Sequence, residues 1–199
     1  MGECQRVDGV LSACMSRDEA YELWRLGQAI ERADMSTRVL GVRAAALLAG
    51  GSGDHDAVQW MGVLRSVSAL QMYQRSHRGP IDGAGIVRFL LYDERFPRSV
   101  AGCAKRMRSA LERLPHTSRT TPALDALDAE LARAGELTAR SDGAVASGEA
   151  LDEAMDRVQV ALAAVTGRIT STFVAAVRAA DDTAVGTVAV TEVGAEASR

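Results

Sequence analysis

The sequence predicts an all-α protein, a bundle of about six amphipathic helices with a disordered C-terminal tail, and two observations lead to this. Aromatic residues make up 4% of the 199 residues, whereas hydrophobic residues make up 47% and are mostly Ala, Leu and Val. That balance favours helices over sheets. Apolar residues also recur at steps of three and four, which is the spacing of helices with one buried face. We expect one helical domain over residues 1–180.

The expected helices begin and end at recognisable residues. A short lead-in over residues 1–15 precedes a capping box, Ser16-Arg17-Asp18-Glu19. Pro97 suits the first turn of a helix, and Pro115 would end it. Residues 181–199 are small and polar, which predicts the disordered tail. The expected helices cover roughly residues 17–48, 56–76, 81–92, 97–114, 122–140 and 148–180.

A charged stripe lies beside the apolar seam of the first helix. It consists of Gly27, Glu31, Asp34, Arg38 and Gly41, again at steps of three and four. Because glycine lets a neighbouring backbone come close, we expect the charges between the glycines to be partly buried. Buried charge is costly unless it is paired, so the stripe is either an ion-pair network or a polar pocket for a ligand or partner.

Arg98 and Ser99 follow Pro97 at the start of a predicted helix. Such a start offers unpaired amides and positive potential, which suits an anion. The structural alternative is that Arg98 reaches across and neutralises Glu31, while Asp34 pairs with Arg38 within its helix. We therefore predict an ion pair between Glu31 and an arginine of another segment, with Arg98 as the first candidate.

Several classes of function have little support. A formal charge of −3 and a pI near 5.7 argue against a nucleic-acid partner. We expect no membrane partner, because no apolar run approaches the ~20 residues of a span, and the unevenly spaced cysteines predict reduced thiols in a cytoplasmic protein. No phosphate-loop or dinucleotide motif is present, so no cofactor is predicted.

Metal and thiol chemistry are weakly supported as well. The three histidines, His55, His77 and His116, fall at helix breaks, and a carboxylate-only Mg²⁺ or Mn²⁺ site on Glu31 and Asp34 is a minor alternative. Cys103 lies on an apolar helix face, which indicates a core residue rather than a nucleophile.

Four stretches resemble the bacterial alpha-E domain family, helical proteins with a Glu-Arg motif. Over roughly residues 7–180 they are Met15-Ser16-Arg17-Asp18-Glu19-Ala20, Leu26-Gly27 with Glu31-Arg32-Ala33-Asp34, Trp60 with Leu64-Arg65-Ser66-Val67-Ser68-Ala69, and Phe89-Leu90-Leu91 with Phe96-Pro97-Arg98-Ser99-Val100. The resemblance implies a cytoplasmic bacterial protein. With the stripe, it gives a candidate polar site of Glu31, Arg32, Asp34, Arg38, Arg98 and Ser99.

The resemblance also implies a functional setting. The family is encoded beside ATP-grasp peptide-ligase-like and transglutaminase-like proteins, so we expect a helical accessory or interaction domain in peptide or amide-bond synthesis or modification. The alternatives are an enzyme that uses Glu31 as general base or metal ligand and Arg98 as anion clamp, or a purely structural bundle half. Full-length relatives contain two related halves and this chain resembles the second. We therefore expect a homodimer, or a complex with the missing N-terminal half, joined partly through the first long helix.

Overall fold

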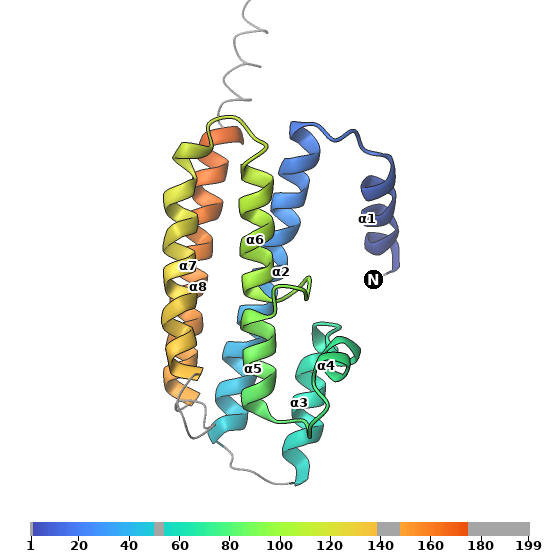
Figure 1. Cartoon of the computed structure of the whole chain (residues 1–199), viewed down its shortest axis with the longest axis vertical. Helices are drawn as coiled ribbons and strands as arrows, with labels where there is room; N and C mark the ends of the chain where they lie inside the picture. The colour runs from blue at the N-terminus through green and yellow to red at the C-terminus, as the bar shows by residue number, and fades with distance from the viewer. Residues whose placement is uncertain (1, 50–53, 139–147, 175–199) are drawn as a thin grey trace, which may run out of the picture.

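The computed structural model describes residues 2–49, 54–138 and 148–174, and all regular structure in these ranges is helical (Figure 1). The all-α prediction is confirmed. The predicted tail, residues 181–199, lies outside the described residues. The elements are α1 (Gly2–Cys14), α2 (Glu19–Ala49), α3 (Asp54–Ser66), α4 (Leu70–Ser76), α5 (Gly83–Tyr92), α6 (Val100–Leu111), a 3-10 turn (Thr117–Arg119), α7 (Thr121–Thr138), α8 (Gly148–Ile169) and a π-helical turn (Thr170–Val174).

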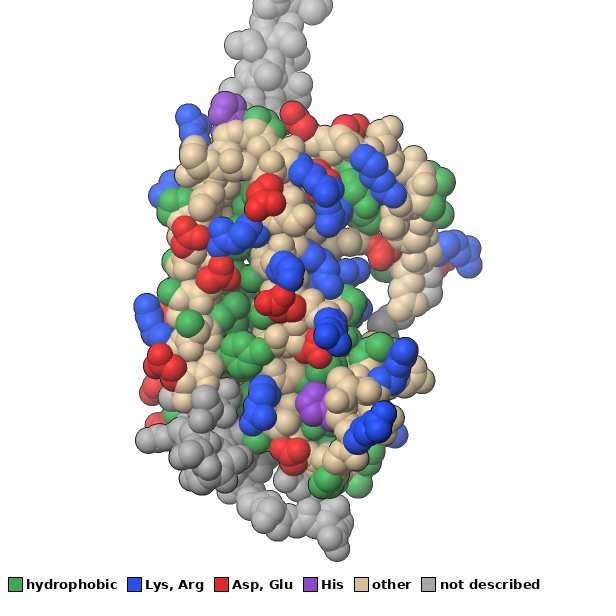
Figure 2. All heavy atoms as spheres, in the orientation of Figure 1, with side chains coloured by type: hydrophobic (Ala, Val, Ile, Leu, Met, Phe, Trp, Pro, Cys, Tyr) green, Lys and Arg blue, Asp and Glu red, His purple; other side chains and the backbone are tan. Residues whose placement is uncertain are grey.

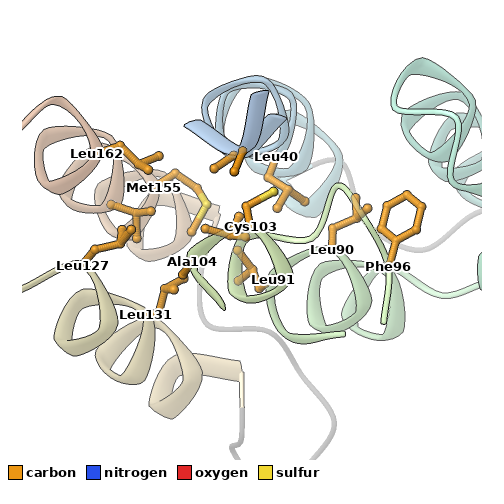
Figure 3. Packing of buried hydrophobic residues seen from close by; sticks show 14 of the residues in the cluster. Leu40, Leu90, Leu91, Phe96, Cys103, Ala104, Leu127, Leu131, Met155 and Leu162 are labelled. Carbon is orange, nitrogen blue, oxygen red and sulfur yellow. The ribbon is translucent and has the colours of Figure 1, made fainter. Parts of the chain in front are cut away.

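Four helices form the centre of the fold. Helix α2 packs on α6 and α8, and α7 completes the ring by packing on α8 and α6. Helix α5 continues below α6, with α3 and α4 beside it, whereas α1 stands apart from the ring next to α2 (Figure 1). The hydrophobic core is one cluster that extends from α2 through α3, α5 and α6 to α7 and α8. Figure 3 shows the part where α6, α7 and α8 meet, with Leu127, Leu131 and Met155 near Ala104.

The predicted seam of α2 is confirmed where side chains are described. Leu26, Ala33 and Leu40 are fully buried. The two glycines of the charged stripe differ from each other. A Cβ at Gly41 would lie 3.2 Å from Asp152 Oδ1 on α8, whereas a Cβ at Gly27 would meet nothing within 4 Å. Close approach of a neighbouring helix therefore explains Gly41 and does not explain Gly27.

The N-terminal lead-in predicted for residues 1–15 is wrong, because most of it is helix α1. Val7, Val10, Leu11 and Cys14 have helical spacing, and the single Gly9 does not break the helix. The predicted cap is also displaced. The N-cap is Asp18 rather than Ser16, since Asp18 Oδ1 accepts a hydrogen bond from the amide of Tyr21, the third residue of α2, at 3.1 Å.

The predicted continuous helix over residues 56–76 is broken between α3 and α4. Ser68 has φ of 56°, which is the left-handed region. Its amide donates to Arg65 O, and the amide of Ala69 donates to Leu64 O at 2.7 Å. These two bonds form a Schellman motif. The prediction missed the break because serine stands where this motif usually has glycine.

Candidate functional site

A cleft of about 570 Å³ lies between α1 and α2, and the loop before α6 contributes to one wall. Three of the predicted site residues, Glu31, Arg32 and Arg98, line it. The other lining residues come mostly from α1 and from one face of α2: Glu3, Cys4, Gln5, Val7, Asp8, Leu11, Trp24, Gln28 and Met35.

Helix α1 is held to α2 mainly by one carboxylate. Gln28 Nε2 donates to Asp8 Oδ1, and an Arg32 guanidinium nitrogen lies 3.7 Å from Asp8 Oδ2. The side chains of Val7 and Val10 remain 58% and 54% exposed. Polar contacts rather than a buried apolar interface therefore position this wall of the cleft.

The opposite wall is positioned by two serines. Ser36 Oγ on α2 donates to Arg98 O at 2.6 Å. Ser99 is the N-cap of α6, since its Oγ accepts from Gly102 N at 3.0 Å. Pro97 thus lies in the loop, and the helix begins at Val100 rather than at Pro97 as predicted. The backbone is fixed on both sides of Arg98, while its guanidinium makes no hydrogen bond or ion pair with another described residue.

The predicted ion pair of Glu31 is wrong. The Glu31 side chain is exposed and forms no ion pair with any residue in the described ranges, Arg98 included. Glu31 lies on the side of α2 that borders the cleft, and its side chain is open to solvent there. Glu31 and Arg98 therefore line one cleft without neutralising each other.

The Asp34–Arg38 pair within α2 is confirmed. Arg38 Nε lies 2.8 Å from Asp34 Oδ2, and this hydrogen bond raises the pKa of Arg38. Neither residue lines the cleft. The six predicted site residues therefore do not form one site. Glu31, Arg32 and Arg98 line the cleft, Asp34 and Arg38 form an ion pair on the surface of α2, and Ser99 is the buried N-cap of α6.

Three arginines, Arg32, Arg98 and Arg106, act electrostatically on the buried thiol of Cys103. Burial raises the pKa of this thiol to about 11, although Arg106, Arg32 and Arg98 each lower it. Arg106 donates to Pro97 O at 3.0 Å rather than to an acid. Figure 2 shows Lys and Arg side chains through the middle of this face, with Asp and Glu among them. Cys103 is therefore a neutral core residue, as predicted. Of the three arginines near it, Arg32 contacts Asp8, whereas no ion pair with a described acid is found for Arg98 or Arg106.

One buried charge was missed in the sequence. Glu22 is 3% exposed, and its carboxylate accepts from Arg25 at 2.8 Å and from Arg113 at 3.0 Å. Glu22 lies four residues before Leu26 on the apolar seam of α2, and a carboxylate at a seam position is the signal that could have found it. It joins α2 to the segment after α6.

Two classes of feature are not found in the described ranges. No cluster of three or more His, Cys, Asp or Glu side chains could hold a metal ion there. Every described helix is also too short or too polar to cross a bilayer.

Comparison with known proteins identifies the family. Residues 1–174 match the Alpha-E family model, described as a predicted alpha-helical domain with a conserved ER motif. The chain belongs to this family. No curated protein and no solved structure matches it.

Proposed function

We propose that this chain is a helical accessory domain that binds a protein partner through the cleft between α1 and α2. The chain contains three Glu-Arg dipeptides, at residues 31–32, 94–95 and 112–113. Both residues of the first dipeptide line the cleft, together with Arg98. Glu94 pairs with Lys105, and Arg113 pairs with Glu22. The observation that carries the proposal is therefore that Glu31 and Arg32 lie in one cleft with Arg98, where neither Glu31 nor Arg98 forms an ion pair with a described residue.

The alternatives fit the cleft less well. The enzyme alternative assigns Glu31 as general base or metal ligand and Arg98 as anion clamp, yet no cluster of three or more His, Cys, Asp or Glu side chains in the described ranges supports the metal-ligand version. If Glu31 had a purely structural role, its carboxylate would be buried or paired between helices. The Glu31 side chain is exposed instead. Unpaired charges on a preformed concave surface favour recognition over either alternative.

The partners we propose are the ATP-grasp peptide-ligase-like and transglutaminase-like proteins of the bacterial cytoplasm. The domain would hold them, or the chain that they modify, during peptide or amide-bond synthesis or modification. Arginine and carboxylate side chains at the rim of such a surface give specificity and faster association.

A second copy of the chain, or a missing N-terminal half, is a further occupant that the cleft could accept. Val7, Val10 and Met35 are exposed apolar side chains on α1 and α2, and a partner would remove them from water. Sedimentation at micromolar concentration tests this proposal. A dimer that Arg98→Glu dissociates supports it, and a monomer at all concentrations rejects it.

The accessory role is tested by calorimetric titration of the purified domain with each purified partner. We expect a complex that Arg98→Glu and Glu31→Arg each weaken at least tenfold, which is ~1.4 kcal/mol. Arg119→Glu is the matched control, since Arg119 is exposed and does not line the cleft. Equal affinities for wild type and cleft variants, with unchanged circular dichroism, would overturn the proposal.

A further inference from the structure

We infer that the cleft takes a short peptide segment that carries one carboxylate and one ammonium group beside an apolar side chain. This inference rests on the proposed function, because it assumes that the cleft binds a partner. It adds the chemistry of the bound group, and three properties of the lining lead to it.

The first property is an arginine prepared for a carboxylate. The loop around Arg98 is fixed by the 2.6 Å bond from Ser36 and by the Ser99 cap, while the guanidinium is left without a described partner. A guanidinium presents a rigid fork that matches carboxylate geometry. Arg32 lies in the same cleft, and its 3.7 Å contact with Asp8 is long for a hydrogen bond. A carboxylate would therefore find two cationic groups.

The second property is the acid beside these arginines. Glu31 lines the cleft without an ion pair to a described residue, and Glu3 and Asp8 line it as well. Three carboxylates would repel a multiply charged anion such as a phosphate. They would stabilise an ammonium group on a ligand whose carboxylate contacts Arg98, so the lining matches a ligand that carries both charges.

The third property is the apolar part of the lining. Trp24, Leu11 and Met35 are exposed or half-buried there, and the volume of about 570 Å³ lies within the roughly 300–1,000 Å³ of small-ligand sites. An apolar side chain of a peptide would cover these groups. Carboxylate, ammonium and apolar side chain together describe a peptide with free ends better than a nucleotide or a sugar.

Calorimetry with one tripeptide, alanyl-leucyl-alanine, tests the inference in four forms: free, C-amidated, N-acetylated, and blocked at both ends. We expect the free peptide to bind wild-type protein most tightly. Amidation and acetylation should each weaken binding about tenfold, since each removes one charged contact. Arg98→Gln should weaken the free peptide about tenfold and leave the amidated peptide unchanged. Glu31→Gln should weaken the free peptide and leave the acetylated peptide unchanged.

Two further arms sharpen the outcome. Alanyl-glutamyl-alanine amide tests whether an acidic side chain can supply the carboxylate. If it can, this amide should bind as tightly as free alanyl-leucyl-alanine. Arg119→Gln should bind all forms as wild type does. No binding of the free peptide, or equal binding of all four forms, would overturn the inference. The proposed function fails separately, when the purified partner proteins do not bind.

Discussion

The Ser36 hydroxyl on α2 donates a 2.6 Å hydrogen bond to the main-chain carbonyl of Arg98, 62 residues further along the chain. Ser36 is 1% exposed, so this bond is shielded from water. Helix α2 thus carries Glu31 and Arg32 and also holds the backbone at Arg98. The fold therefore determines how these three cleft residues are placed relative to one another.

Ser36→Ala should lower the free energy of unfolding by about 1–2 kcal/mol, because it leaves a shielded carbonyl without its donor. Urea denaturation measures the change. Ser118→Ala is the control, since Ser118 is exposed beside α7 and should show no measurable effect. A Ser36→Ala protein as stable as wild type would show that this bond does not hold the Arg98 loop.

Glu22→Gln should lower the free energy of unfolding by about 2 kcal/mol. The substitution weakens charge-assisted bonds to Arg25 and Arg113, and both arginines are exposed enough for water to solvate them afterwards. The matched control is Glu112→Gln, an exposed carboxylate next to Arg113 in the chain. Similar denaturation midpoints for the two variants would contradict a stabilising role for the Glu22 network.

Two glycine substitutions should have opposite signs. A Cβ at Gly102 would lie 2.7 Å from the Phe96 carbonyl oxygen, so Gly102→Ala must displace the loop and should cost ~2 kcal/mol or more. Gly27→Ala meets open space in a helix interior and should stabilise the protein by roughly 0.5–1 kcal/mol. Thermal denaturation of both variants is the measurement. A destabilising Gly27→Ala would restore the idea that the charged stripe packs closely against a neighbour.

The Cys103 thiol should make stability depend on pH in the alkaline range. Its pKa is raised to about 11 in the folded protein by burial, so unfolding releases a proton once pH exceeds the ordinary thiol value. The stabilising contribution is complete below the ordinary pKa and is lost as pH rises to about 11. The stability advantage of wild type over Cys103→Ala, measured by urea denaturation, should therefore shrink across this range. A constant difference would contradict the shifted pKa.

Helical periodicity was sufficient to predict much of this fold. The seam through Leu26, Ala33 and Leu40 repeats over many turns, so it identified α2 and its buried face. The break at Ser68 could not be predicted, because serine adopts a left-handed conformation only where the surrounding packing requires it. Helix α1 was missed because it buries little apolar surface, so its sequence shows no long apolar seam.

The candidate site was predicted in composition and not in geometry. Spacing placed Glu31 beside the seam of α2, but spacing cannot tell whether the neighbouring surface is another helix or a cleft. The position of α1 decides this, and α1 is held by contacts such as Gln28–Asp8 that no periodicity reveals. Arg98 was identified at a helix start, but its distance from Glu31 depends on the tertiary fold.

Helix α1 carries a probe of the cleft and a control for it. Cys4 lines the cleft, whereas Cys14 is exposed on the same helix outside the lining. The most direct measurement is the alkylation rate of each thiol, followed by mass spectrometry with and without a saturating amount of the proposed ATP-grasp-like partner. We predict that the bound partner slows alkylation of Cys4 severalfold and leaves the rate at Cys14 unchanged. An unchanged rate at Cys4 in a complex that demonstrably forms would contradict the cleft as its binding site.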